Sequence, residues 1–503
     1  MNKLLTVAIF GGLSALVVSF ALEHKESWIL QADSVDTARE AVLRVGGDVT
    51  HELGLINGVG ATLTEAQAEE LAGDEDLRLY RDQTVTLDRK TGDQRRYARQ
   101  KHKKQKHKKP DRRNNRHRYR RDHHERSVGI ADHHDNGVTN EVAPEAEFLK
   151  RVGIDAAFAY QHHGQDVTIA IVDTGYMGRY RPLTHDLNGT RRVKAEYNAI
   201  TNSSHNVFDG SGHGTHIASV MMSSRLSSSG ATMSVAPMAG LVVVKAFDSD
   251  GRGTYANIIR ALDWVVTHGE THGVRVINLS FSTPARSFYW DDPLNQAVMA
   301  VWKAGFVVVT SAGNGGPDPM TIGVPGNVPY VITVGAMTDN FTPDDRSDDR
   351  LTFFTASGPT YEGFVKPDMV APGGHILGVM HDKVHKIARD HPEFAMPGQW
   401  LYQLSGTSQA SAVASAIAAL ILQVDPYLSP DDVKCRMLAA SQPALSEQGE
   451  FVYSVFQQGA GLVHAPTAVQ GTAYGCANQG LDVARDLAGS QHYRGNANQD
   501  SDG

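Results

Sequence analysis

Near-continuous apolar runs recur through the middle of the chain, at residues 167–172, 241–247, 274–279 and 306–310. Runs of this kind, without alternating polar residues, suit strands that are buried on both faces of a parallel sheet. Residues 255–267 and 293–303, which lie between these runs, are typical of helices. The pattern therefore predicts an α/β fold with a doubly wound, mostly parallel sheet over residues 144–470.

A shorter pattern precedes this domain, at residues 22–88. Extended stretches are expected at residues 28–31, 49–55, 58–63 and 79–87. Ser34 is placed to cap a helix that Gly46 and Gly47 end, and Thr64 is placed to open a second helix. The order β-α-β-β-α-β predicts a small α+β domain of the ferredoxin-like kind.

The first residues of the chain indicate export. Lys3 is followed by an uncharged run at residues 4–22, and Ser19 and Ala21 are small residues at the positions that precede a cleavage site. This pattern is typical of a signal peptide, residues 1–21, and of a secreted protein that is extracellular or periplasmic. The run is also long enough for an uncleaved membrane anchor, which is the alternative.

The formal net charge of -8 conceals one strongly basic segment. Residues 89–126 contain 18 of the 48 Lys and Arg residues but 4 of the 56 Asp and Glu residues, so the rest of the chain is acidic. Dense like charge with few apolar residues predicts a disordered linker over residues 89–143. Binding to a polyanion, such as nucleic acid or an anionic surface polymer, and docking onto the acidic remainder are the alternatives.

Two cysteines, Cys435 and Cys476, are present in the chain. In an exported protein an even count fits one disulfide, with two unpaired thiols as the alternative. Residues 471–503 are rich in Gly, Asn and Asp. We therefore expect a loose C-terminal tail there, apart from Cys476.

The first candidate for chemistry is Asp173, which ends the first predicted strand of the sheet and precedes Thr174 and Gly175. Parallel sheets place their ligands at the carboxyl ends of strands, where a buried carboxylate can orient a histidine and stabilise its imidazolium form. Asp-Thr-Gly is also the signature of the aspartic proteases. Their chemistry needs two carboxylates that share one proton, whereas this chain has a single Asp-Thr-Gly.

The second candidate is His213, in the sequence Gly-His-Gly-Thr-His, whose glycines permit close backbone packing. An imidazole in such a position is a candidate general base. His213 and His216 are also a candidate pair of metal ligands, but no third ligand stands at a convincing spacing.

Ser408, in Gly-Thr-Ser, begins a segment of small residues that is expected to form a buried helix. The N-terminus of a helix favours negative charge, so Ser408 is either a nucleophile or an ordinary helix cap. Position 410 is alanine, so the segment lacks the Gly-x-Ser-x-Gly of the α/β-hydrolases. Asn314 follows a buried run and lies between glycines, where it is either a turn residue or a donor to an oxyanion.

The motifs Asp-Thr-Gly, His-Gly-Thr-His and Gly-Thr-Ser, in this order, resemble those of the subtilisin-like serine proteases. Asn314 and the segments 276–280, 366–373 and 459–463 agree with the same family, and the resemblance covers residues 150–470. It implies a secreted serine endopeptidase that is made as a zymogen. In that interpretation residues 22–88 are an inhibitory propeptide.

The resemblance also assigns roles to single residues. Asp173, His213 and Ser408 are a catalytic triad, and Asn314 donates to the oxyanion together with the backbone N–H of Ser408. The substrate-binding residues that it implies are Ser280, Phe281, Ser282 and residues 323–326 at the S1 pocket, with Tyr255, Ile258 and Phe281 at a further apolar subsite. Tyr255 and Ile258 are alternatively the buried face of a helix. Because Gly323 leaves the base of the S1 pocket open and nothing charged lines it, we expect a large apolar P1 residue.

Three features depart from the family pattern. The proline and histidine that usually follow the serine are Ala412 and Val413, and the usual glycine on the S1 wall is Ser282. A side chain at position 282 is expected to narrow the cleft. An extra segment, at about residues 380–399, precedes Ser408.

The chemistry requires no cofactor, although the resemblance implies structural calcium. Asp186 resembles one calcium ligand position, but calcium takes about six to eight oxygen ligands. The expected partners of a monomeric enzyme are protein or peptide substrates and its own propeptide. The alternative function is a catalytically inactive subtilisin-fold binding protein that its basic segment retains at a surface.

Overall fold

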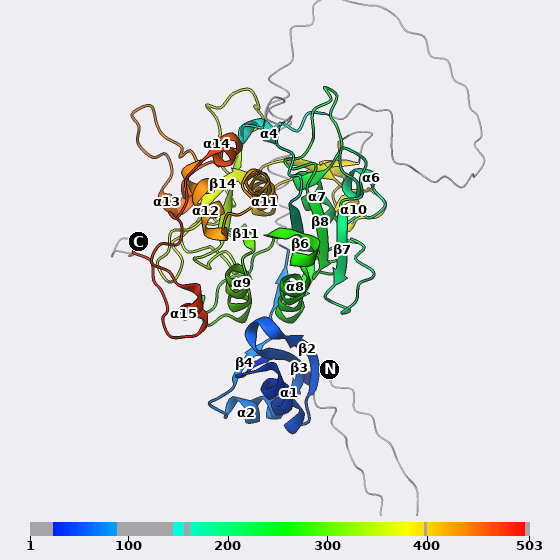
Figure 1. Ribbon diagram of the computed structural model, residues 1–503, viewed down its shortest axis with the longest axis vertical. Coiled ribbons are helices and arrows are strands. Elements are labelled where there is room, and N and C mark those ends of the chain that lie inside the picture. The colour runs from blue at the N-terminus through cyan, green and yellow to red at the C-terminus, as the bar shows by residue number, and fades with distance from the viewer. Residues whose placement is uncertain (1–23, 88–143, 155–160, 397–399, 498–503) are drawn as a thin grey trace, which may run out of the picture.

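The computed structural model describes residues 24–87, 144–154, 161–396 and 400–497. A small unit formed by residues 24–87 lies against one side of a larger unit that contains the other described residues (Figure 1). The predicted signal peptide and the predicted basic linker lie outside the described residues.

A sheet of eight strands forms the centre of the larger unit. Its strands are β6 (Thr168–Asp173), β7 (Val193–Asn198), β8 (Gly240–Lys245), β10 (Val274–Leu279), β11 (Val307–Ser311), β12 (Ile332–Thr338), β13 (Arg350–Leu351) and β14 (Met369–Pro372). The order across the sheet is β13-β12-β11-β10-β6-β8-β7, with β14 also paired to β12, and every pair is parallel except β12 with β13. The predicted doubly wound fold is therefore confirmed. The chain order reverses between β6 and β10, where such sheets form their ligand sites.

Helices cover both faces of this sheet. Helices α7 (His213–Met222) and α11 (Thr407–Val424) pack together on one face, and α8 (Tyr255–His268) and α9 (Pro293–Lys303) pack together on the other (Figure 1). Most residues of α11 are Ala, Ser or aliphatic, and this helix contacts five strands of the sheet. By length and apolarity alone α11 could cross a membrane, but 83% of it is buried inside the protein.

The remaining elements of the larger unit are short. The helices are α4 (Phe148–Arg151), α6 (Arg181–Thr184), α10 (Lys386–Asp390), α12 (Pro430–Ala439), α13 (Val455–Gln458), α14 (Ala465–Gln470) and α15 (Val483–Leu487). An antiparallel ribbon of β15 (Ile376–Val379) and β16 (Leu401–Leu404) leads into α11.

The small unit has the element order that the sequence predicts. Its elements are β1 (Lys25–Gln31), α1 (Val35–Arg44), β2 (Asp48–Leu53), β3 (Gly58–Thr64), α2 (Glu65–Ala72) and β4 (Arg78–Arg81). The sheet order is β2-β3-β1-β4. Ser34 Oγ accepts the N–H of Thr37 at 3.1 Å, and Thr64 forms a reciprocal capping box with Gln67. Both predicted helix starts are therefore confirmed.

The single strand expected at residues 79–87 is wrong, because the chain leaves the small sheet after β4. Asp82 Oδ1 accepts the N–H of Ala256 at 3.0 Å, and Gln83 O accepts the N–H of Tyr255 at 3.0 Å. Residues 82–83 thus bond to the first turn of α8. The next residues form β5 (Thr84–Thr86), which pairs antiparallel with β9 (Arg252–Thr254) of the larger unit.

The expectation of a loose tail is also wrong for residues 471–497. Asp486, which is 2% exposed, accepts hydrogen bonds from the hydroxyls of Tyr289 at 2.6 Å and Tyr330 at 2.8 Å. Its other oxygen lies 2.8 Å from Nδ1 of His492. A buried carboxylate is costly without such donors, so they hold the tail on the domain. The predicted disulfide between Cys435 and Cys476 is confirmed and fixes the start of the same tail.

His216 joins α7 to the ribbon of β15 and β16. Its Nε2 donates to the carbonyl of Tyr402 at 3.2 Å, and Ser219 Oγ accepts the N–H of Val379 at 2.8 Å. Burial lowers the pKa of His216 to about 3, although the bond to Tyr402 opposes that shift. This histidine therefore stays neutral in the folded protein at pH values where it takes up a proton in the unfolded chain.

The stability of the fold should fall as pH falls through this range. Between its unfolded pKa of about 6.5 and its folded pKa, His216 favours the unfolded state by about 1.4 kcal/mol per pH unit. His216→Gln keeps a donor for Tyr402 but does not titrate. We expect the free energy of unfolding, measured with a denaturant from about pH 6 to pH 4, to fall less steeply in this variant by about that amount. His205→Gln, at an exposed histidine, is the control and should retain the wild-type slope.

Candidate active site

The site begins with a buried carboxylate and a histidine. Asp173 is the last residue of β6, and His213 is the first residue of α7. Nδ1 of His213 lies 2.8 Å and 2.9 Å from the two carboxylate oxygens of Asp173, which is fully buried. An ionised carboxylate only accepts hydrogen bonds, so Nδ1 carries the proton of the neutral ring and Nε2 is the acceptor. Sequence reasoning paired these two residues, and the structure brings them together.

Thr174 joins the end of β6 to the first turn of α7. Its backbone N–H donates to Asp173 Oδ1 at 2.7 Å, and its Oγ1 accepts the N–H of Gly214 at 2.9 Å. Lys245, the last residue of β8, donates from Nζ to the carbonyl of Thr174 at 2.5 Å. These bonds fix the end of β6, which carries Asp173, to the first turn of α7, which carries His213.

Asp209 is a residue of the site that sequence reasoning missed. Its Oδ1 accepts the backbone N–H groups of Ser211 at 2.9 Å and Gly212 at 2.7 Å. Its Oδ2 accepts the N–H of Thr215 at 2.9 Å and the hydroxyl of Thr215 at 2.7 Å. Asp209 therefore fixes the turn that starts α7. The sequence does contain a signal for this role, an aspartate that directly precedes Gly-Ser-Gly before a helix. Aspartate at such a position often accepts hydrogen bonds from the free backbone N–H groups at the start of the helix.

Asn314 and Ser408 approach each other beside Gly406. Asn314 Oδ1 accepts both the N–H of Thr407 at 2.9 Å and its hydroxyl at 3.1 Å, which directs the amide nitrogen away from Thr407. A Cβ atom added to Gly406 would lie 2.8 Å from Oε1 of Gln409, and 3.7 Å from both Asn314 Nδ2 and the backbone nitrogen of Ser408. Two hydrogen-bond donors therefore lie beside Gly406, and the side chain of Gln409 is the group nearest to the added atom.

The hydroxyl of Ser408 is turned toward the end of β10. It donates to the carbonyl of Ser280 at 2.9 Å, and among the described residues no hydrogen bond joins it to His213. Ser280 is itself held by its own hydroxyl, which lies 2.7 Å from Asn278 Nδ2 and 3.0 Å from Ser411 Oγ. The structure thus gathers Ser408, Ser280 and Asn314 at one place, with the Ser408 hydroxyl bonded to the carbonyl of Ser280.

The two predicted walls of the S1 pocket lie side by side. Thr283 and Val324 exchange backbone hydrogen bonds of 3.0 Å and 2.7 Å. A Cβ atom added to Gly323 would lie 2.1 Å from Oγ of Ser282, so the Ser282 hydroxyl occupies that space. The side chain that replaces a glycine at position 282 therefore points at Gly323.

The residues predicted for the second subsite are buried in the main hydrophobic core. Tyr255, Ile258 and Phe281 are each at most 2% exposed, and they share that core with Val85 and Leu87 of the β5 segment. Tyr255 and Ile258 are therefore as buried as expected if they form the buried face of a helix, which was the alternative to a role in a subsite. Ala412 and Val413, at the positions that depart from the family pattern, are also fully buried, in α11.

No cluster of carboxylates surrounds Asp186 among the described residues. Its Oδ1 already accepts the backbone N–H groups of Asn188 and Thr190, each at 2.9 Å. Within the part of the chain that the structure describes, no group of three or more His, Cys, Asp or Glu side chains converges on one point. Calcium takes about six to eight oxygens, so a single carboxylate in a turn is not enough. The prediction of a calcium ligand at Asp186 receives no support.

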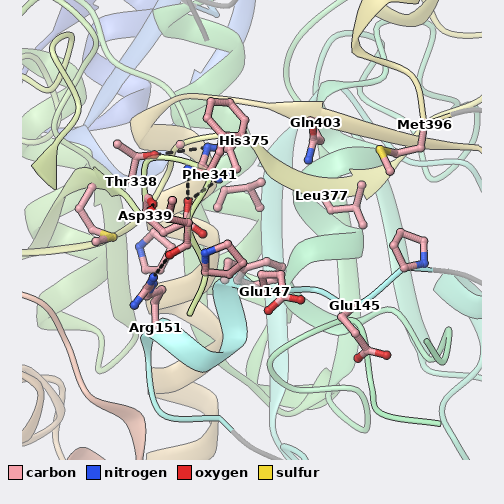
Figure 2. A pocket seen from close by; sticks show the side chains of 18 residues that line it. Glu145, Glu147, Arg151, Thr338, Asp339, Phe341, His375, Leu377, Met396 and Gln403 are labelled. Carbon is pink, nitrogen blue, oxygen red and sulfur yellow. Dashed lines mark hydrogen bonds and ion pairs between the residues drawn. The ribbon is translucent and has the colours of Figure 1, made fainter. Parts of the chain in front are cut away.

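A cavity of about 370 Å³ lies apart from these residues. Figure 2 shows the cluster of Thr338, Asp339 and His375 at one end and Leu377 and Met396 at the other. His375 Nε2 lies 2.5 Å from Asp339 Oδ1, so these polar groups satisfy each other. None of the residues predicted for catalysis or substrate binding lines the cavity, which is therefore not the predicted substrate cleft.

Known proteins with similar sequences identify the family of this chain. The chain is 37% identical over 318 residues to the serine protease AprX of Bacillus subtilis (strain 168), covering 61% of this chain and 67% of that protein. It is 29% identical over 318 residues to subtilisin DY of Bacillus licheniformis, covering 63% and 95%.

Among solved structures, the chain is similar to fervidolysin from Fervidobacterium pennivorans, a keratinolytic enzyme related to subtilisin. The TM-score is 0.61 at 21% identity, covering 89% of this chain and 61% of that one, which shows the shared fold. Residues 164–461 match the subtilase family. The chain therefore belongs to the subtilase family of subtilisin-like serine endopeptidases.

Proposed function

We propose that this subtilase is a secreted zymogen that hydrolyses peptide bonds with Asp173, His213 and Ser408, and stabilises the oxyanion with Asn314. The observation that carries the proposal is the buried bond between Asp173 and His213, on the same sheet edge as the two donors beside Gly406. A nucleophile, a base held by a carboxylate and a site for developing negative charge are what acyl transfer needs.

The reaction starts with a change in the Ser408 side chain. Rotation about its Cα–Cβ bond releases the carbonyl of Ser280 and brings Oγ to Nε2 of His213, which takes the proton as Oγ attacks the scissile carbonyl carbon. Asp173 stabilises the imidazolium that results. His213 then gives the proton to the leaving amine, and water cleaves the acyl-enzyme by the same sequence of proton transfers.

The carbonyl oxygen that becomes negative lies in the space beside Gly406. Asn314 Nδ2 and the backbone N–H of Ser408 donate to it there, and the start of α11 adds the positive end of the helix dipole. Asn314 needs no reorganisation during the reaction, because Thr407 already fixes its amide. On the substrate side, the uncharged walls at residues 280–283 and 323–326 favour a large apolar P1 residue, and Ser282 limits its size.

The segment at residues 84–87 supports the role of the small unit as an inhibitory propeptide. β5 pairs with β9, and Leu87 N–H donates to the carbonyl of Gly251 at 2.9 Å. A Cβ atom at Gly210 would meet Ser249 at 2.8 Å, so the turn after β8 lies against the loop that precedes His213. A strand that covers β9 there competes with any substrate for the same edge.

Export is the third part of the proposal. A signal peptide at residues 1–21 and the Cys435–Cys476 disulfide both fit an oxidising compartment outside the cytosol. Residues 89–143 then link the propeptide to a monomeric catalytic domain, and their basic character suits polyanion binding.

Reaction with a fluorophosphonate tests the proposed nucleophile. We expect the matured protein to be labelled at Ser408, identified by mass spectrometry of the modified peptide, because only an activated serine reacts quickly with such a probe. Heat-denatured protein and Ser408→Ala should remain unlabelled. Folded matured protein without label at Ser408 contradicts the proposal.

Two substitutions test the oxyanion site from opposite sides. Asn314→Leu removes one donor, and Gly406→Ala places a methyl group 3.7 Å from both donors, where it also meets Oε1 of Gln409 at 2.8 Å. Asn314→Leu should lower kcat on a peptide substrate by about 10²–10³, the loss that follows removal of one such donor in subtilisin. Gly406→Ala should also lower kcat, because its methyl group takes space beside both donors. Gly315→Ala is the matched control, because nothing lies within 4 Å of the added Cβ atom, and it should keep kcat. Wild-type kcat in Asn314→Leu removes Asn314 from the mechanism.

Expression of Ser408→Ala tests self-processing. We expect the wild-type chain to be shortened by cleavage between residues 87 and 142, and the variant to persist as an intact precursor that contains the small unit. N-terminal sequencing of both secreted products gives the maturation site. Added wild-type enzyme should process the variant, which shows that its cleavage site is intact. Equal maturation of the isolated variant means that another protease performs the step.

A further inference from the structure

Residues 380–396, hereafter the clamp, form a compact segment between β15 and β16 and correspond to the extra segment that the sequence analysis identified. The clamp and the adjoining strand share a small hydrophobic core of their own, formed by Met380, Ile387, Ala388, Phe394, Tyr402 and Leu404. A segment with its own core has a defined shape, so its contacts with neighbours are fixed rather than incidental.

The first contact of the clamp is with the loop that precedes His213. The backbone N–H of Lys386 donates to the carbonyl of Gly210 at 2.9 Å, and the N–H of Ile387 donates to the carbonyl of Ser211 at 3.0 Å. Both donors belong to the first turn of α10, whose N–H groups have no partner inside the helix. The loop before His213 thus provides the cap of α10.

The second contact lies at Gly212, the residue immediately before His213. Gly212 has φ of +98°, and a Cβ atom there would lie 2.8 Å from Cβ of His385 and 2.9 Å from Sδ of Met380. His385 is fully buried, and its Nδ1 accepts the N–H of His381 at 3.0 Å. Burial lowers the pKa of His385, so its imidazole ring is neutral where it packs against Gly212.

The clamp is also tied to the other half of the proposed triad. β16 leaves the clamp and ends four residues before Ser408, and Gly406 N–H donates to the carbonyl of Gly373, just before β15. One continuous piece of chain therefore contacts the turn before the proposed base and positions the turn before the proposed nucleophile.

We propose that the clamp sets the position of His213 relative to Ser408, and that His385 is its main positioning residue. This inference rests on the proposed function of that pair. His385 acts through Gly212, so its loss should slow the chemical step and leave substrate binding unchanged. A general base must lie within hydrogen-bond reach of the nucleophile, and a displacement of about 1 Å can cost about 100-fold in rate.

Steady-state kinetics of three point variants of the full-length chain, matured in the same way, test the inference. His385→Ala opens the space at Gly212 and should lower kcat about tenfold or more, with KM within about twofold of wild type. His385→Asn keeps an acceptor at the position of Nδ1 for the N–H of His381 and should recover most of the lost kcat. Lys383→Ala changes an exposed side chain of the same segment and should match wild type.

A deletion variant tests the clamp as a whole. Met380 N–H donates to the carbonyl of Trp400 at 3.1 Å, so these residues pair at the end of the β15–β16 ribbon. Replacing residues 381–399 by Asn-Gly closes the ribbon with a two-residue hairpin and keeps its strand pairs. This variant should fold, lose kcat at least as much as His385→Ala, and keep KM. If His385→Ala does not fold, the kinetics of this deletion variant test the inference in its place.

The outcomes separate this inference from the proposed function. Unchanged kcat in the variants that fold, or a raised KM with unchanged kcat, overturns the inference. If neither His385→Ala nor the deletion variant folds, the segment serves stability and the inference is likewise overturned. If the wild-type chain reacts with a fluorophosphonate at Ser408 while the variants are unaffected, the proposed function stands and the role of the clamp is lost. If the wild-type chain does not react, the proposed function itself fails.

Discussion

The hydrogen bond between Asp173 and His213 is buried, so the ionised carboxylate of Asp173 lies where water does not reach. An ion removed from water costs several kcal/mol unless donors surround it, so the neighbouring structure has to supply them. Thr174 supplies a backbone N–H, and His213 supplies Nδ1–H because its helix starts at the correct place. The turn that Asp209 holds, just before His213, serves this requirement.

The parts of the fold that follow from local patterns could be predicted from the sequence. Buried strands such as β6 and helix starts such as Ser34 depend on residues within one short window, and the three motifs of the family are local as well. The errors came from single aspartates with distant partners: Asp82 bonds to a residue 174 positions away, and Asp486 to one 156 positions away. Composition marks such residues as ordinary loop carboxylates, because nothing in their own window identifies the donor.

The contact between β5 and β9 has a strength that suits the proposed role of the small unit as a temporary inhibitor. Val85 and Leu87 are at most 2% exposed, and complete burial of such side chains contributes about 1.5–3 kcal/mol each. While residues 84–87 belong to the same chain as the catalytic domain, their effective concentration is high and the edge of β9 stays covered. Cleavage of the connection removes that advantage, so a contact of this size can then be exchanged for a substrate.

The loop that precedes His213, the proposed general base, belongs to a class of segments that are usually less rigid than a strand or a helix. Here the residue before His213 is a glycine, which by itself adds freedom to the backbone at the position where precision is needed. Contacts from two directions remove that freedom: Asp209 accepts the N–H of Gly212, and His385 fills the space that a side chain would take. A larger residue at position 212 would supply its own rigidity but would exclude His385. The absence of a side chain at this position therefore allows a distant segment to determine where the imidazole lies.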